Sequence, residues 1–282
     1  MKTYLQKAAT LTQALPYIRK FNSKILIIKY GGSAMENEEL KRSVMQDIAL
    51  LKLVGLKPII IHGGGKDISL MCDRLGIKSE FKNGLRISSK EALEVASMVL
   101  FKINKDLVQN LQCQGVKAIG LCGKDGGLLQ AELKDESLGF VGRIKEVRSE
   151  VLKDLLEKDF LPVIAPIAMD EAYESYNTNA DDVAVELAKA LKAEKLVFLS
   201  DVEGIYKDYE DKSSLISRLD LTQAKELLTH MQGGMFVKLA SCIEALQNGV
   251  KRVHILDGRV PHSLLLEIFT DEGIGTLIGA KQ

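Results

Sequence analysis

Short runs of β-branched and aliphatic residues alternate along this chain with longer segments in which apolar residues recur at helical spacing. Strands separated by helices in this way pair in parallel, because each helix carries the chain back along a face of the sheet. We therefore predict an α/β fold. The expected strands span residues 24–29, 57–61, 117–121, 161–166, 195–199 and 252–256, with a hairpin-like stretch at 128–147. The expected helices span residues 38–53, 89–114, 149–158, 181–191, 221–228 and 237–248, and a further helix begins near residue 67.

Residues 1–21 precede the first expected strand and have a helical pattern of their own. Pro16 interrupts that pattern, and a proline inside a helix removes a hydrogen bond and bends the axis. We therefore predict a kinked amphipathic segment, which packs either on the core or on another subunit.

Composition excludes several classes of partner. The 38 basic and 38 acidic side chains cancel, so the chain lacks the broad positive field with which proteins collect nucleic acid. No apolar run approaches the roughly 18 residues that span a bilayer, and the N-terminus lacks the order of residues typical of a signal peptide. The four cysteines are scattered without a C-x-x-C pair. We expect a cytoplasmic protein that binds neither nucleic acid nor membrane and holds no metal through its own side chains.

Two glycine-rich loops follow expected strands, at the sheet edge where open α/β folds bind their ligands. Lys29 stands before a glycine pair at residues 31–32, and a glycine triplet occupies residues 63–65. Glycines let backbone N–H groups approach an anion closely, and the lysine adds positive charge. The alternatives are a simple tight turn for the pair and close packing of strand against helix for the triplet.

The glycine triplet matches neither of two familiar phosphate-binding motifs. Ile60 stands where the first glycine of a P-loop is required, and Asp67 follows Lys66 in place of the serine or threonine. Ile68 occupies the last glycine position of the dinucleotide fingerprint, which argues against a nicotinamide oxidoreductase.

Polar residues follow in two further loops. Arg86 ends a turn that begins at Asn83. An isolated arginine is usually a solvated charge. If Arg86 faces the glycine triplet, however, its planar guanidinium can bind a carboxylate through two parallel hydrogen bonds. Residues 177–182, with the sequence Asn-Thr-Asn-Ala-Asp-Asp, lead into an expected helix. Capping of that helix accounts for one of the four polar Asn and Asp side chains, and the others exceed what capping needs.

Two later loops complete the set. Residues 200–206 follow a strand, and a glycine pair at residues 233–234 leads Lys238 into a helix. A surface lysine is the simpler interpretation of Lys238. Together with Lys29, an aspartate and an arginine, however, it supplies what phosphoryl transfer requires, which is positive charge and positioning without a nucleophilic side chain.

In this order the motifs resemble the amino-acid kinase superfamily and, within it, the N-acetylglutamate kinases. The segments that carry the resemblance are Lys29-Tyr-Gly-Gly, His62-Gly-Gly-Gly, Asn83-Gly-Leu-Arg86, Gly123-Lys-Asp-Gly-Gly, Asn177-Thr-Asn-Ala-Asp181, Ser200-Asp-Val-Glu-Gly204 and Gly233-Gly-Met-Phe-Val-Lys238. The resemblance implies a three-layer αβα sandwich with a mostly parallel central sheet. It also implies ATP-dependent phosphorylation of the γ-carboxylate of N-acetyl-L-glutamate, the second step of arginine biosynthesis, with Mg²⁺ carried by the nucleotide.

The same resemblance implies that two lobes bind the two substrates. Residues 23–178 would form an N-terminal lobe for acetylglutamate binding and dimerisation, and residues 179–282 a C-terminal lobe for ATP. Lys29 and Lys238 would stabilise charge on the phosphoryl group, and Asp181 would hold both lysines. The implied substrate-binding residues are Gly64, Gly65, Arg86, Asn177 and Asn179. The implied phosphate-binding residues are Gly31, Gly32 and Gly64, and those for the nucleotide are Ser200, Asp201, Gly204, Tyr206, Gly233 and Met235.

Residues 8–35 resemble the arginine-inhibited branch of the family. In that branch the N-terminal helix, here residues 1–22, joins three dimers into a hexameric ring. The implied arginine effector site lies in the C-terminal lobe and comprises residues 254–259, 266–269 and 273–276. Glu267 would contact arginine there, with Gly273 and Tyr17 beside it.

The sequence departs from the family pattern at three positions. Ser33 stands where asparagine is expected, and Lys66 and Asp67 replace the usual proline and its neighbour. Lys66 either adds charge near the phosphate or points to solvent. Two rival functions stay open: another acyl-phosphate kinase of the superfamily, and an arginine-sensing module that has lost catalysis. The intact pair of lysines and their aspartate argue against the second.

Overall fold

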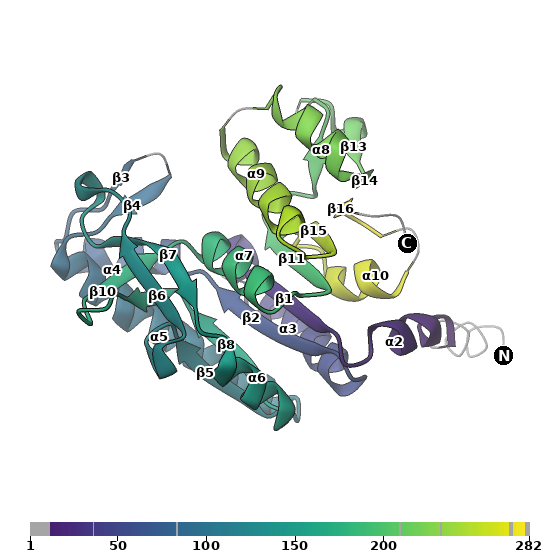
Figure 1. The fold of residues 1–282 in the computed structure, drawn as a ribbon, viewed down its shortest axis with the longest axis horizontal. Coiled ribbons are helices and arrows are strands. Elements are labelled where there is room, and N and C mark those ends of the chain that lie inside the picture. The colour runs from purple at the N-terminus through teal and green to yellow at the C-terminus, as the bar shows by residue number, and fades with distance from the viewer. Residues whose placement is uncertain are drawn as a thin grey trace.

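The structure of the chain, a computed structural model, describes residues 12–35, 37–82, 84–208, 210–231, 233–270 and 273–279. Predictions that concern residues 1–11, Asn83 or the Ser33 side chain fall outside this part. In Figure 1 the blue and teal elements lie on the left and centre, the green and yellow C-terminal elements lie on the right, and the purple helix of the N-terminal segment also lies on the right. One central sheet joins the two sides.

The central sheet is mostly parallel, as the sequence predicted. Its strands, in spatial order, are β14 (Arg218–Leu219), β16 (Thr276–Gly279), β15 (Arg252–Asp257), β11 (Lys195–Ser200), β1 (Ile25–Tyr30), β2 (Lys57–His62), β8 (Leu161–Ala165) and β5 (Ala118–Cys122). Within this sheet β16 runs antiparallel to β15, and the other described neighbours are parallel. The α/β prediction is confirmed.

Alternate side chains of β1 enter different cores, because successive residues of a strand point to opposite faces. Ile27 lies in one core, and Leu26 and Ile28 lie in the other. The first core adjoins α6 (Glu150–Glu157), α7 (Ala180–Ala190) and α9 (Gly233–Gln247), and the second adjoins α3 (Glu38–Leu53), α5 (Lys90–Cys113) and α10 (Ser263–Phe269). Helices therefore cover both faces of the sheet, which gives the three layers.

Smaller elements surround the carboxyl ends of the central strands. The hairpin predicted at 128–147 is present as two strands of a small closed barrel made of β10 (Ser175–Thr178), β7 (Val141–Val147), β6 (Leu129–Leu133) and β9 (Ile167–Met169). Further short elements are β3 (Glu80–Lys82), β4 (Leu85–Ile87), β12 (Ile205–Tyr206), β13 (Leu215–Ile216), α4 (Gly65–Arg74), α8 (Leu221–Leu228), η1 (Gly32–Met35), η2 (Asp125–Gly127), η3 (Glu136–Leu138) and η4 (Lys212–Ser214).

Two helices begin earlier than the sequence predicted. Helix α4 begins at Gly65 instead of near residue 67, and α9 begins at Gly233 instead of residue 237. Glycines are poor helix formers and are therefore expected outside helices. Here they supply the backbone N–H groups of the first turn, which have no partner within a helix.

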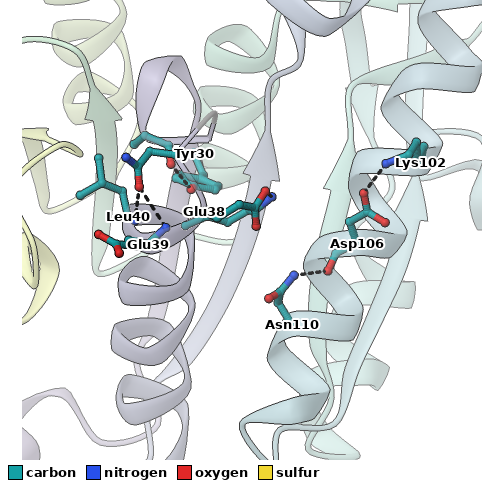
Figure 2. A network of polar contacts seen from close by, with 10 residues as sticks. Tyr30, Glu38, Glu39, Leu40, Lys102, Asp106 and Asn110 are labelled. Atoms are coloured by element: carbon teal, nitrogen blue, oxygen red, sulfur yellow. Dashed lines mark hydrogen bonds and ion pairs between the residues drawn. The ribbon is translucent and has the colours of Figure 1, made fainter.

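Tyr30 closes the loop that follows β1. Its hydroxyl donates a 2.8 Å hydrogen bond to Ala34 O, and Figure 2 shows Tyr30 beside the first turn of α3. Asn37 caps that helix, because its side chain accepts from the backbone N–H groups of Glu39 and Leu40. The glycine pair at 31–32 is thus held between a buried strand and a capped helix.

In the N-terminal segment, helix α2 spans Leu15–Phe21 and lies beside α10, as Figure 1 shows. Among the described residues, 12 and 13 are helical and Ala14 separates them from α2, so the helical pattern is interrupted close to Pro16. Phe21 is buried in the core, whereas Leu15 is 54% exposed. Among the described residues, no helix has both the length and the apolar character needed to cross a bilayer.

Candidate active site

Two lysines meet one aspartate at the carboxyl edge of the sheet. Lys29 lies near the end of β1, Asp181 lies in the first turn of α7, and Lys238 lies in α9. Lys29 Nζ is 2.9 Å from Asp181 Oδ1, and Lys238 Nζ is 3.6 Å from Asp181 Oδ2. The predicted catalytic trio is therefore assembled from elements that are far apart in the sequence.

The carboxylate of Asp181 is ionised by its neighbours. Burial alone disfavours the charged form, but attraction to the Lys29 and Lys238 ammonium groups outweighs it and lowers the pKa of Asp181. The Lys238 ammonium also lies 5.3 Å from the centre of the Phe198 ring, a favourable distance for a cation–π contact. The trio thus holds two positive charges next to one negative charge.

The glycine pair after β1 makes room for charged groups. A Cβ at residue 31 would lie 2.7 Å from Lys29 Nζ, and a Cβ at residue 32 would lie 2.3 Å from Asp201 Oδ1. Gly32 also has φ = +76°, a backbone conformation that favours glycine. The turn interpretation is thus correct for Gly32, and the loop also brings the Asp201 carboxylate against it.

The glycine triplet forms one wall of a pocket. The pocket is lined by the triplet, by the β3–β4 hairpin and by the segment that enters α7, namely Gly63, Gly64, Gly65, Ile68, Phe81, Gly84, Leu85, Arg86, Leu100, Val141, Pro166, Asn177, Thr178, Asn179 and Ala180. A Cβ on Gly64 would lie 2.9 Å from the side chains of Leu100 and Ile103, so close packing explains this glycine. In the described part of the chain, apart from its chain neighbours and the backbone of α4, no atom lies within 4 Å of a Cβ built on Gly65, so packing does not explain that glycine.

Arg86 is not a solvated surface charge, because it is only 7% exposed. Its guanidinium donates to Ser79 Oγ at 2.8 Å, to Ser69 Oγ at 2.7 Å and to Gly65 O at 2.7 Å. It also lies 4.7 Å from the centre of the Phe81 ring. These contacts tie the β3–β4 hairpin to the first turns of α4 and place a fixed cation in the pocket wall.

The residues before α7 divide between capping and pocket lining. Asn179 is the N-cap of α7 and accepts a 2.7 Å hydrogen bond from the backbone N–H of Asp181. Asn177 lines the pocket, and its Nδ2 lies 3.4 Å from Ser88 Oγ. Capping therefore explains Asn179, as the structural alternative predicted, and it also positions Asp181.

A second pocket adjoins Lys238 on the other side. It is lined by Ser200, Val202, Tyr206, Lys207, Met231, Gly234, Met235 and Lys238. Ser200, Tyr206 and Met235 were predicted for the nucleotide, and Val202 lies in the same predicted loop. Lys207 and Met231 were not predicted, because a lysine and a methionine just outside the glycine-containing segments match no motif.

Two predicted nucleotide-site residues have structural explanations. A Cβ on Gly204 would lie 2.4 Å from Thr276 Oγ1, which accepts a hydrogen bond from Ile205 N. Gly204 therefore lets the loop pack on β16. Gly233 has φ = +67° at the start of α9, which favours glycine for backbone reasons alone.

The residues predicted for the effector belong to a separate buried cluster. Glu267 accepts from His254 Nδ1 at 2.6 Å and from Ile274 N at 2.9 Å, and a Cβ on Gly273 would lie 2.7 Å from Glu267 Oε2. His254 Nε2 in turn lies 3.2 Å from Lys195 Nζ.

Two more aromatic residues adjoin this cluster. The Lys195 ammonium lies 4.6 Å from the centre of the Phe21 ring, and Tyr17 packs against the same core. His254 belongs to the stretch that the resemblance assigned to the effector site. The sequence missed Lys195, because it is a lone polar residue within a strand and matches no motif.

A model of the amino acid kinase family matches residues 24–257. The chain belongs to the amino acid kinase family. The acetylglutamate kinase of a Campylobacter jejuni strain is 71% identical over 279 residues, which cover 99% of this chain and 100% of that protein. The acetylglutamate kinase of Thermoanaerobacter pseudethanolicus is 55% identical over 283 residues, which cover 98% of this chain and 94% of that protein.

Solved structures agree with this family fold. An N-acetylglutamate synthase from Neisseria gonorrhoeae, complexed with coenzyme A and N-acetyl-glutamate, superposes with a TM-score of 0.87 at 25% identity. The match covers 98% of this chain but only 64% of the synthase chain. Carbamate kinase from Giardia lamblia superposes with a TM-score of 0.69 at 17% identity and shares the fold. The prediction of an amino-acid kinase architecture is confirmed.

Proposed function

We propose that this chain transfers the γ-phosphate of ATP to the γ-carboxylate of N-acetyl-L-glutamate, forming N-acetyl-L-glutamyl 5-phosphate and ADP. The observation that carries the proposal is the position of Lys29, Asp181 and Lys238 between the two pockets. The names of the two acetylglutamate kinases, which match nearly the whole chain at 71% and 55% identity, support this choice of substrate.

The reaction needs charge and positioning more than it needs a base. A carboxylate is already ionised at pH 7, so the barrier lies in bringing an anion against a polyanion. A carboxylate oxygen forms the new bond to the γ-phosphorus while the bond from that phosphorus to the bridging oxygen of ADP breaks. Lys29 and Lys238 stabilise the charge that builds up on the transferring oxygens, and Asp181 keeps both ammonium groups in place.

The pocket beside the glycine triplet suits acetylglutamate. Arg86 and Asn177 offer hydrogen-bond donors to its carboxylate and amide groups, and Phe81 and Leu85 offer apolar contact to its methyl and methylene groups. The pocket beside Lys238 suits the nucleotide, with Met231 among its apolar walls, and Mg²⁺ enters with ATP as part of that substrate. In this proposal residues 23–178 bind the acyl substrate and residues 179–282 bind ATP.

Regulation by arginine is the second part of the proposal. A buried carboxylate at Glu267, with its pKa lowered although burial opposes that shift, is suited to a guanidinium ligand. The cluster also adjoins α2, so an N-terminal helix that joins dimers into a hexamer would link the effector to assembly. We expect a form without residues 1–22 to be an active dimer that arginine does not inhibit. A truncated form that is still hexameric and inhibited contradicts this part.

One coupled assay of ADP release tests the activity. We expect turnover with ATP and N-acetyl-L-glutamate, little with glutamate or aspartate, and inhibition by added arginine. Turnover that prefers free glutamate or aspartate identifies another acyl-phosphate kinase. Arginine binding without turnover of any of the three acids identifies a sensing module that has lost catalysis.

A further inference from the structure

His62 is the last residue of β2 and stands directly before the glycine triplet, yet the transfer chemistry gives it no role. Its side chain is fully buried. Its Nδ1 lies 2.9 Å from Gly63 O, and its Nε2 lies 3.3 Å from Nδ2 of Asn104 in α5. Both ring nitrogens therefore have a partner.

The partners fix the tautomer of the ring. Gly63 O is a carbonyl and can only accept, so Nδ1 must carry a proton. Asn104 Nδ2 lies 2.9 Å from Val163 O and 3.3 Å from Leu121 O, two more carbonyls, so the amide nitrogen faces them and is a donor toward His62. The Nε2 atom of His62 must then accept. Burial also lowers the pKa of His62 to about 4, so the ring is neutral at pH 7.

The fold reserves space for this amide. A Cβ on Gly120 would lie 1.9 Å from Asn104 Oδ1, so any larger residue at position 120 would displace the side chain. Asn104 is only 2% exposed, and its bonds reach β8, β5 and the end of β2. All three contacts come from Nδ2, which has two hydrogens, so one hydrogen is shared between two acceptors. Desolvation of this buried amide costs free energy, and these bonds offset that cost.

His62 completes a set of bonds that fixes the glycine triplet. Gly63 N donates to Tyr30 O at 2.8 Å, and Gly64 O accepts from Ile68 N at 2.9 Å. Gly65 O accepts from Arg86 at 2.7 Å, and His62 holds Gly63 O. In a trans peptide the N–H points opposite to the preceding carbonyl. The bond to Gly63 O therefore fixes the direction of the Gly64 N–H in the pocket wall.

We propose that His62, held by Asn104 as the neutral Nδ1–H tautomer, is a positioning residue that aims the Gly64 N–H at the transferring phosphoryl group. The inference rests on the proposed kinase function. It adds to that function a group that touches neither substrate and acts through the peptide between Gly63 and Gly64. The tautomer itself can be measured without any turnover.

The first test is ¹⁵N NMR of the histidine rings in the free protein. The chain has four histidines, so assignment by single His→Asn variants is practical. We expect His62 to show a protonated Nδ1 and an unprotonated Nε2, unchanged from pH 6 to pH 9. A protonated Nε2 overturns the proposal, whether or not the protein phosphorylates acetylglutamate.

The second test reverses the tautomer with Asn104→Asp. A carboxylate at that position accepts from Nε2, so the neutral ring carries its proton there and turns a lone pair toward Gly63 O. The added negative charge also raises the pKa of His62, although the Lys105 ammonium, which donates to Gly120 O at 3.0 Å, partly offsets it. Below the raised pKa both nitrogens are protonated and the Gly63 bond returns. We therefore expect kcat of Asn104→Asp to fall as pH rises through that pKa.

A matched control lies on the same helix. Asn110 donates to Asp106 O, one turn back on α5, as Figure 2 shows. We expect Asn110→Asp to keep the kcat and the pH profile of the original protein. If Asn104→Asp has the same pH profile as Asn110→Asp, the proposal is wrong.

A pair of His62 variants tests the inference if Asn104→Asp does not fold. An asparagine amide nitrogen occupies nearly the position of Nδ1 and can donate to Gly63 O, whereas a glutamine amide nitrogen occupies that of Nε2. We expect His62→Asn to keep most of kcat and His62→Gln to lose roughly 10- to 100-fold, the scale of a small misplacement at a reacting centre. KM for ATP should change little in both. Equal kcat values for the two variants overturn the proposal, and no turnover in the original protein overturns the kinase function instead.

Discussion

Asp181 brings together two side chains that would otherwise repel each other. Lys29 and Lys238 come from β1 and α9, and each ammonium lies within 4 Å of one oxygen of the same carboxylate. The side chain of Lys238 is 15% exposed and that of Lys29 is 16% exposed, so solvent screens neither strongly. Positive charge is therefore fixed in place before substrate arrives, as charge stabilisation in phosphoryl transfer requires.

Removing either lysine tests this arrangement. We expect Lys29→Ala and Lys238→Ala each to lower kcat by roughly 10²- to 10³-fold, the usual cost of losing one preorganised group, with a smaller change in substrate affinity. Lys102→Ala is the matched control, because Lys102 forms an exposed pair with Asp106 on α5. Steady-state kinetics check this, and near-normal turnover in either active-site variant contradicts the proposed role.

Arg86 should act on binding more than on chemistry. Its guanidinium is oriented by Ser79, Ser69 and Gly65 O at the edge of the acyl pocket. We expect Arg86→Ala to raise KM for acetylglutamate far more than it lowers kcat. Arg86→Lys should fail to restore KM, because an ammonium cannot reproduce the planar fork. An unchanged KM in the alanine variant would remove Arg86 from the substrate site.

At the scale of elements, the sequence predicted long strands and helices well and short ones poorly. The six predicted strands of the central sheet are all present. Five of them carry a run of buried residues, and in β5 only the two end residues, Ala118 and Cys122, are buried. Strands β9 and β10 and the hairpin β3–β4 have only three or four residues, too few to show a period. Strand β16, which lies beside the edge strand β14, and the early start of α9 were also missed, since glycines stand at or near each boundary.

The cap of α7 joins an element to the chemistry. Asn179→Ala removes the side chain that accepts from Asp181 N, which should cost about 1 kcal/mol of stability. It should also lower kcat, because the backbone N–H of Asp181 is then no longer held by the cap and its carboxylate is positioned less well against the two lysines. Asn37→Ala is the matched control, since Asn37 caps α3 in the same way. We expect similar losses of stability in both by urea unfolding, and a loss of kcat in Asn179→Ala alone; equal kcat values contradict this link.

At the scale of the whole molecule, the sheet order explains how distant motifs meet. Strands β11, β1 and β2 are neighbours, so the loops after Ser200, Tyr30 and His62 share one edge of the sheet. The sequence indicated which loops carry chemistry, because glycines and charged residues cluster there. It could not show that Asp201 lies against Gly32 or that His62 bonds to Asn104, since those contacts depend on strand order and helix packing.

Two buried histidines make the stability of the whole fold sensitive to acid. Burial lowers the pKa of His62 to about 4, and burial with the nearby Lys195 charge lowers that of His254 to about 4. The unfolded chain therefore takes up these protons first, and the stability from both groups is full above about pH 6.5 and lost as pH falls toward 4. Asp47 opposes this, because burial raises its pKa to about 6 and its protonation favours the folded state.

Two histidines outweigh one carboxylate, so we expect the free energy of unfolding to fall between pH 6.5 and pH 4.5. Urea unfolding at several pH values measures this slope. His62→Asn removes one of the two depressed groups and should flatten the slope, because the unfolded chain then takes up one proton fewer in that range. His230→Asn is the control, since His230 is exposed, and it should keep the original slope. If His62→Asn loses stability with falling pH as steeply as His230→Asn, then His62 is not held neutral by the fold.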